Sequence, residues 1–277
     1  MQKKKKATPK PKPVSIVESI PIEEQHNVIF KPNDGPQTSF LAAGEREVLY
    51  GGSAGGGKSY AMLADPLRYM GHPAFSGLLL RHTTEELREL IFKSQEMYPK
   101  IWPGIKWSER KMQWTAPSGA RLWMSYLDRE DDVLRYQGLA FSWIGFDELT
   151  QWPSPFAWNY MRSRLRSTAP DLPVYMRATT NPGGRGHHWV KKMFIDPAAH
   201  NKAFDATDIE TGEVLKYPAG HEKAGRSLFK RKFIPARLSD NPYLSRQGDY
   251  EAMLLSLPEQ QRRQLLDGDW DIKEGAA

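Results

Sequence analysis

The 277-residue sequence contains no cysteine, which excludes disulfides, thiolate metal sites and cysteine nucleophiles and fits a reducing compartment. It also lacks any run of 18 apolar residues, and its N-terminus has no apolar core of the kind found in signal peptides. We therefore expect neither a membrane-spanning protein nor one secreted by that route. Acidic residues are in the minority, and the net charge of +6 favours a polyanionic partner without identifying it.

Most of the chain has the composition of a folded protein, with 39% hydrophobic residues and nine tryptophans. Residues 1–30 differ, because Lys3–Lys6 and the alternating Pro9–Pro13 cannot form a core. We expect this stretch to be an extended, mobile arm. Such an arm is either a solvated tail or a contact to nucleic acid, and the sequence leaves both readings open.

The pattern G-x-x-x-x-G-K-S occupies Gly52–Ser59, between the apolar run Val48–Tyr50 and a helix-like segment. Its glycines let the backbone approach a phosphate, and successive N–H groups then point at the anion. Lys58 is expected to reach the β- and γ-phosphates, and the Ser59 hydroxyl to ligate Mg²⁺. The sequence thus predicts ATP and Mg²⁺ as cofactors, held by Gly52, Ser53, Ala54, Gly55, Gly56, Gly57, Lys58 and Ser59.

Two residues upstream of this loop are candidates for recognising the base. The amide of Gln37 could pair with N6 and N7 of adenine. Phe40 is a second candidate, for stacking on the adenine ring.

A second chemical signature is the hydrophobic stretch from Phe141 that ends in Asp147 and Glu148. Near a phosphate-binding loop, Asp147 is expected to hold Mg²⁺ beside Ser59, and Glu148 to orient and deprotonate the attacking water. An ordinary strand-to-loop junction would also carry acids. Their combination with Lys58 favours catalysis, and water as the acceptor indicates hydrolysis rather than phosphoryl transfer to a small molecule.

A third strand pattern, Val174–Pro182, also ends in polar residues. We expect Thr179–Asn181 to sense the γ-phosphate, with Asn181 at the nucleotide, and to pass its loss to the turn that follows. His187 and His188 have no carboxylate at metal-like spacing, so they are interpreted as structural or helix-start residues.

The alternation of strand and helix patterns predicts an α/β fold with a mostly parallel sheet and flanking helices, a P-loop NTPase core of the ASCE or RecA-like type. Residues 107–126 are expected to add a β-hairpin beside the sheet edge. A helix is predicted over Pro155–Arg166, and two more over 245–256 and 259–267 with Pro258 at the break. The predicted domains are the arm, a core over 31–200 and a lid over 201–277, in which Lys230–Lys232 either track phosphates or form a solvated strand face.

Taken in order, the motifs resemble the large terminase subunit of tailed bacteriophages over about residues 30–272. They are Pro36-Gln37-Thr38, the glycine loop, Leu78-Leu79-Leu80-Arg81, Trp143–Glu148, Ser163–Arg166, Ala178–Gly184, Asn241–Leu244 and Leu265–Trp270. The resemblance implies a motor ATPase that moves viral double-stranded DNA into a procapsid in the host cytoplasm. It also implies a homo-oligomeric ring on the portal protein, and a small terminase subunit as a further partner.

Two departures from the family pattern matter. Many relatives carry a basic residue early in the loop, where this chain has Gly52, Ser53 and Ala54. The resemblance therefore directs attention to an arginine from a neighbouring subunit, for which Arg135 is the leading candidate and Arg81 and Arg164 are competitors. The family also continues into a nuclease domain, whereas this sequence ends at Ala277, so no nuclease activity is expected in it.

Two other functions remain open at this point. One is a RecA-like helicase or remodelling ATPase, which single-stranded rather than duplex DNA would stimulate. The other is a nucleotide-dependent DNA-binding or assembly subunit without turnover.

Overall fold

The computed structural model describes residues 30–246 and 248–272, in which nine strands form one sheet of order β3-β4-β5-β2-β6-β7-β1-β9-β8. Strands β5, β2, β6, β7, β1 and β9 run parallel, and the pairs β3–β4, β4–β5 and β8–β9 are antiparallel. The bounds are β1 Glu47–Gly52, β2 Ser76–Arg81, β3 Lys106–Ser108, β4 Gln113–Thr115, β5 Arg121–Tyr126, β6 Trp143–Asp147, β7 Tyr175–Thr180, β8 Ala203–Asp205 and β9 Lys230–Ala236. The mostly parallel α/β sheet is confirmed.

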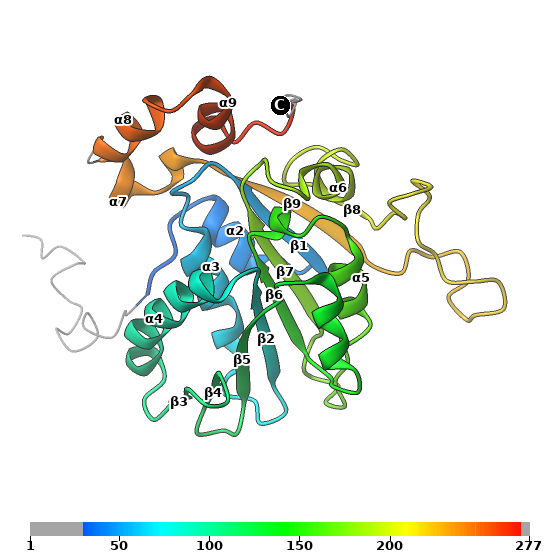
Figure 1. Ribbon diagram of the computed structural model, residues 1–277. Helices are drawn as coiled ribbons and strands as arrows, with labels where there is room; N and C mark the ends of the chain where they lie inside the picture. Colours follow the sequence, from blue (N-terminus) through cyan, green and yellow to red (C-terminus); the bar gives the residue numbers. More distant parts are fainter. Residues whose placement is uncertain (1–29, 247, 273–277) are drawn as a thin grey trace, which may run out of the picture. The chain divides into compact units, whose positions relative to one another are not determined.

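Helices cover both faces of the sheet (Figure 1). On one face lie α2 (Pro36–Ala42), α3 (Lys58–Ala64) and α4 (Thr84–Ile101), and on the other α5 (Phe156–Arg162) and α6 (His187–Val190). Successive residues of a strand point to opposite faces. Accordingly Val48 and Tyr50 of β1 pack in one cluster with Phe40 and Ala61, while Leu49 packs into the larger cluster on the other face.

Local signals in the sequence account for several elements. Helix α4 begins with a side-chain cap, because the Thr83 hydroxyl accepts a hydrogen bond from the Glu86 N–H at 3.3 Å. Strands β4 and β5 form the predicted hairpin at the sheet edge. Trp114 of this hairpin packs against Trp107 and Tyr98, so these aromatics serve packing.

Two predicted helices differ in extent. The helix expected through Arg166 ends at Arg162, because the following backbone pairs instead with Phe141. The Phe141 N–H donates to the carbonyl of Arg164, and the Arg166 N–H donates to the carbonyl of Phe141, both at 3.0 Å. The helix expected over 245–256 is shorter and begins at Asp249.

The C-terminal elements are α7 (Pro242–Ser245), α8 (Asp249–Leu255), α9 (Glu259–Arg262) and η7 (Arg263–Asp267), and Pro258 marks the predicted break. The sheet continues past the predicted boundary after residue 200. Strand β9 lies beside β1 along its whole length, from Glu47↔Arg231 to Gly52↔Ala236, and β8 pairs with β9. The described residues from Pro32 onward form one compact unit, and the predicted arm lies outside the described residues except for Phe30.

The basic run Lys230–Lys232 is not a free phosphate-binding surface. Arg231 is buried, and its Nε donates to Glu47 Oε2 at 2.7 Å. Burial raises the pKa of Glu47, but Arg162 and Arg231 outweigh it, and the pKa lies below its usual value. The two lysines also have carboxylates of the chain as ion partners. The prediction that this run tracks phosphates is wrong for Arg231.

None of the helices in the described ranges is long and apolar enough to cross a bilayer.

Candidate nucleotide-binding site

The register of the sheet brings four strand ends into one row. Tyr50 of β1 is level with Thr179 of β7, and Thr179 is level with Asp147 of β6. On the far side of β6, Leu80 of β2 is level with Phe146, so Arg81 lies beside Asp147. Side chains alternate along each strand, and those in this row face α3. The carboxyl ends of parallel strands are where such sheets bind ligands.

The glycine loop is fixed by side chains that donate hydrogen bonds to its carbonyl groups. These bonds are Asn241 Nδ2 to Gly55 O at 2.6 Å, Tyr50 OH to Gly56 O at 2.8 Å and Gln37 Nε2 to Gly57 O at 2.9 Å. In a trans peptide the next N–H points away from the carbonyl. The N–H groups of Gly56, Gly57 and Lys58 are thereby turned away from these donors. Among the described residues none accepts a hydrogen bond from the N–H of Gly55, Gly56 or Gly57.

The first residues of the loop have a different role. The N–H groups of Ser53 and Ala54 donate to the carbonyls of Ala236 at 2.8 Å and Leu265 at 2.7 Å. Gly52 has φ of 139°, and a Cβ there would lie 2.2 Å from the Ala236 oxygen. Although Ser53 and Ala54 were predicted to hold phosphate, their amides tie the loop to β9 and η7.

Lys58 begins α3 inside the loop, and its ammonium donates to the Ser53 carbonyl at 2.5 Å. Burial lowers the pKa of Lys58, and the nearby carboxylates of Glu148 and Asp147 act in the opposite direction. Ser59 is the next residue of α3 and borders the same cavity as Lys58.

Asp147 is fully buried at the end of β6. One carboxylate oxygen, Oδ1, accepts a hydrogen bond from the Thr179 hydroxyl. The other, Oδ2, lies 2.9 Å from Arg81 Nε, but the angles do not make a hydrogen bond, and neither atom has another partner. Within the described residues no cluster of three or more His, Asp or Glu side chains has the arrangement of a metal site. A metal here would need ligands beyond the protein carboxylates.

Glu148 has a left-handed backbone, with φ of 61° and ψ of 57°. A residue other than glycine pays roughly 1–2 kcal/mol for this conformation, and such outliers gather at functional sites. Burial and the neighbouring Asp147 raise the pKa of Glu148, while Lys58, Arg81 and the Asn181 backbone act against the shift. The side chain borders the cavity beside the glycine loop.

The end of β7 is hydrogen-bonded to the segment that follows Glu148. The hydroxyls of Thr180 and Thr150 lie 2.7 Å apart, and Thr150 Oγ1 donates to the carbonyl of Asn181. The Asn181 side chain borders the cavity, and its buried Oδ1 has no hydrogen-bond partner. Gly184 packs against the Thr150 carbonyl, and a Cβ on residue 184 would lie only 2.9 Å from that carbonyl oxygen. The three predicted segments are thus brought together.

The cavity at the loop has a volume of about 330 Å³. It is lined by Ala54, Gly55, Gly56, Gly57, Lys58, Ser59, Tyr60, Glu89, Lys93, Glu148, Asn181, Asn241, Leu244 and Tyr250. The sequence reasoning missed the wall formed by α4, α7 and α8. In the sequence, Asn241–Leu244 was noted only as a motif of the family resemblance, and nothing indicated that it borders the cavity.

The residues predicted to recognise adenine serve the loop and the core. Gln37 is buried, with Nε2 on the Gly57 carbonyl and Oε1 accepting from the Asn33 N–H at 2.6 Å. The Phe40 ring is fully buried and stacks on Tyr50 at 5.2 Å, so its predicted contact with the base is wrong. His187 begins α6, accepts a hydrogen bond from the Gly183 N–H and stacks on Trp270, in agreement with a structural role.

The three candidate arginines lie in different places. Arg81 is buried against Asp147 and is inaccessible to another subunit in this arrangement. Arg135 lies on the exposed turn η3 (Glu130–Tyr136), with Asp132 Oδ2 3.2 Å from its guanidinium. Arg164 lies near the amino end of β6, and the glycine loop lies at the opposite, carboxyl ends of the strands.

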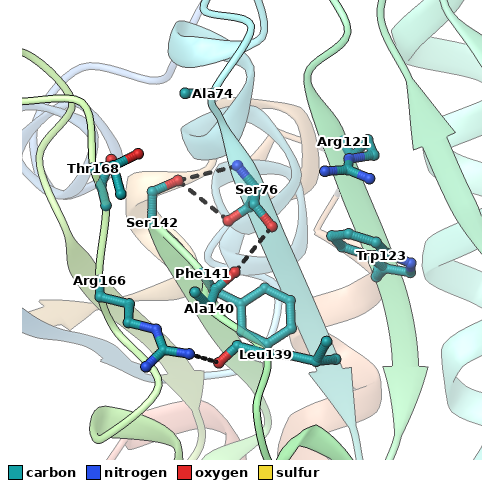
Figure 2. A pocket seen from close by; sticks show the side chains of 11 residues that line it. Ala74, Ser76, Arg121, Trp123, Leu139, Ala140, Phe141, Ser142, Arg166 and Thr168 are labelled. Carbon is teal, nitrogen blue, oxygen red and sulfur yellow. Dashed lines mark hydrogen bonds between the residues drawn. The ribbon is translucent and has the colours of Figure 1, made fainter.

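A larger cavity, of about 520 Å³, lies at the amino ends of β2, β5 and β6. Figure 2 shows Arg121 and Arg166 on opposite sides of it, with the Phe141 ring between them. None of the predicted nucleotide-site residues lines this cavity. The smaller cavity at the loop is therefore the candidate nucleotide site.

The model of the family "Terminase large subunit, T4likevirus-type, N-terminal" matches residues 49–277. The chain belongs to this terminase family. Among curated proteins, none matches the sequence.

Solved structures of terminases share the fold. The large terminase of a thermophilic bacteriophage is 18% identical, with a TM-score of 0.61 over 88% of this chain and 55% of that one. The same protein in complex with ADP gives a TM-score of 0.57 at 18% identity, over 86% of this chain and 54% of that one. The large terminase ATPase domain of Thermus phage P74-26 gives 0.56 at 13% identity, over 90% of this chain and 98% of that one. The chain thus spans about half the length of the first of these terminases, and at these identities the likeness establishes the fold.

Proposed function

We propose that the chain is the ATP-hydrolysing motor part of a terminase large subunit, which moves viral double-stranded DNA into a procapsid. Family membership supports the role in DNA packaging. The observation that carries the ATPase is the fixed glycine loop. Its carbonyls at Gly55, Gly56 and Gly57 are held by side chains, which turns the following N–H groups away from those donors and leaves them available to an anion. Lys58 and Glu148 border the cavity beside that loop.

The residues for Mg²⁺ fit the ion. Magnesium prefers hard oxygen ligands and keeps several waters and phosphate oxygens, so two protein ligands suffice. Ser59 offers a hydroxyl, and the buried Asp147 offers Oδ2, which has no hydrogen bond to any of the described residues. When bound, Mg²⁺ would neutralise charge on the β- and γ-phosphates. Lys58 would leave the Ser53 carbonyl to contact the same phosphates.

Glu148 is proposed as the general base. Its strained backbone directs the residue after β6 away from the strand path, and its raised pKa makes the carboxylate a better proton acceptor for water. Asn181, next to it, is proposed to contact the γ-phosphate. Loss of that phosphate would act on the Thr180–Thr150 hydrogen bond and on the Gly183–Gly184 turn, which offers a route to movement.

The partners follow from the family. We propose a homo-oligomeric ring in the host cytoplasm, with a portal protein and a small terminase subunit as protein partners. Contacts to double-stranded DNA would be to its phosphates and therefore steeply salt-dependent. Arg135 is proposed to act on the nucleotide of a neighbouring subunit, because it is exposed on a turn and is held only by its own helix and nearby tyrosine rings.

The test is steady-state phosphate release with duplex and with single-stranded DNA. We expect duplex DNA to stimulate release, and Lys58→Ala and Glu148→Gln to abolish it, with ATP binding kept in the second variant. Preferential stimulation by single strands would favour a helicase, and ATP binding without release would favour an assembly subunit. Unchanged release in Lys58→Ala would refute the nucleotide site itself.

Mixing wild type with Arg135→Ala tests the trans role. A trans-acting arginine poisons neighbouring sites, so activity falls below the value expected from dilution. The matched control is Arg121→Ala, which removes an exposed arginine at the opposite end of the strands. Mixing this variant with wild type should leave the ATPase activity unchanged.

A further inference from the structure

Arg81 is a buried arginine among carboxylates of the nucleotide site. It ends β2 and is only 8% exposed. Its Nε lies 2.9 Å from Asp147 Oδ2. Lys93 lowers the pKa of Glu89, a cavity-lining residue of α4, and Arg81 adds to that shift. Arg81 also opposes the increase in the pKa of Glu148 that burial and Asp147 cause. The sequence offered Arg81 as a competitor for an arginine acting on a neighbouring subunit, and its ion pair with Asp147 was not predicted.

The pair is incomplete in its geometry. At the amino end of the sheet, Arg231 Nε and Glu47 Oε2 are 2.7 Å apart and form a proper hydrogen bond. Arg81 Nε and Asp147 Oδ2 are nearly as close, yet neither makes a hydrogen bond. A buried charge pair is firmly held only when hydrogen bonds complete it. The Arg81–Asp147 pair therefore supplies charge neutralisation without a fully formed bond.

We propose that Arg81 is a displaceable counter-ion, which neutralises Asp147 in the nucleotide-free site and yields Oδ2 to the divalent cation that arrives with ATP. The inference rests on the proposed function, because it takes Asp147 as the carboxylate for Mg²⁺. Arg81 is then a positioning residue.

The proposal has a consequence for metal binding without nucleotide. Two cations cannot share one buried carboxylate oxygen at low cost, so Arg81 should exclude a bare divalent ion from the site. ATP carries its own negative charge and would offset the repulsion. The metal would therefore enter with the nucleotide and not before it.

The experiment measures binding of Mn²⁺ alone to the nucleotide-free chain, by electron paramagnetic resonance of the free ion. We expect Arg81→Gln to bind Mn²⁺ at least about fivefold more tightly than wild type. A fivefold change is roughly the effect of two unit charges 4 Å apart in bulk water, and it is a lower bound because Mn²⁺ carries a double charge. Arg81→Lys keeps the charge and should stay within about twofold of wild type. Arg121→Gln is the control for loss of an exposed arginine and should leave the affinity unchanged.

The double variant Arg81→Gln/Asp147→Asn locates the effect, because it should lose the added affinity. Tightening that persists in the double variant would place the metal elsewhere and overturn the proposal, as would an Arg81→Gln protein that folds but binds Mn²⁺ like wild type. If Arg81→Gln fails to fold in metal-free buffer, the proposal requires that Mn²⁺ restore folding, and absence of restoration overturns it.

Binding of Mg²⁺–ATP by the wild type is measured alongside. A wild type that does not bind it refutes the proposed function. A wild type that binds it, with no change in Mn²⁺ affinity in Arg81→Gln, refutes only the counter-ion role.

Discussion

The Tyr50 hydroxyl gives a direct test of how the nucleotide loop is shaped. It is fully buried and donates to the Gly56 carbonyl at 2.8 Å, one of the bonds that orient the loop. Tyr50→Phe removes this donor and keeps the ring that stacks on Phe40. A buried carbonyl left without a partner costs about 1–3 kcal/mol, so we expect a loss of unfolding free energy in that range.

The same change should weaken ATP binding. In the variant the Gly56 peptide is free to rotate, and binding must restore its orientation. If restoring the orientation of the Gly56 peptide costs about 1 kcal/mol of binding free energy, the Kd for ATP rises roughly fivefold.

Tyr98→Phe is the matched control. Tyr98 is also fully buried, and its hydroxyl donates to a backbone carbonyl, that of Leu63, at the same distance of 2.8 Å. Its bond fixes α4 on α3 and not the loop. We expect a similar loss of stability in urea unfolding but an unchanged Kd for ATP in calorimetric titration. If Tyr50→Phe and Tyr98→Phe have equal affinities, the hydrogen bonds to the loop carbonyls do not shape the site.

Three further predictions concern backbone space and buried charge. Gly52→Ala should cost roughly 3 kcal/mol or more in urea unfolding, because its Cβ would lie 2.2 Å from the Ala236 oxygen. Gly212→Ala, with a positive φ of 74° but open space, should cost about 1 kcal/mol, and equal costs would contradict the steric argument. Glu47→Gln should lower stability by about 3–5 kcal/mol at pH 7, because it leaves two arginines unpaired. Since the folded pKa of Glu47 is depressed, the wild type should lose this advantage as pH falls below about 4.5. A pH-independent difference would refute the assignment. The pKa of Glu148 is raised in the folded state, so its carboxyl favours folding below the unfolded pKa and loses that contribution as pH rises through the folded pKa. Glu148→Gln should therefore melt at a higher temperature than wild type toward neutral pH and show little difference near pH 4. The reverse trend would contradict the burial argument.

The sequence predicted the chemistry that lies at strand ends. The spacing in Gly52–Ser59 and the acids after a hydrophobic run are local signals, and parallel strands necessarily bring their carboxyl ends to one edge. The residue pattern alone therefore suffices to place Asp147, Glu148 and Asn181 together. The P-loop α/β fold was predictable for the same reason.

Contacts that join distant segments were not predictable. Strand β9 could be recognised as a strand, but nothing local says that its neighbour is β1, about 180 residues earlier. Because the sequence does not reveal that pairing, the predicted lid boundary after residue 200 falls within the sheet, and the cavity wall from Asn241 to Tyr250 was not predicted. Arg81 and Arg231 were misread because a buried arginine has the same local sequence signature as an exposed one. The hydrogen bond from Gln37 to the loop and the burial of Phe40 were not predictable, because their distance from the loop fits a structural brace as well as a contact to the base.

The left-handed backbone at Glu148 has a consequence for engineering. Glycine at this position would relieve the conformational cost and remove a poorly solvated carboxylate, and such a variant would melt at a higher temperature. A screen for thermostability alone would then select replacements of the proposed base. Stabilised variants of this terminase chain are best selected on ATP turnover, with residue 148 held fixed.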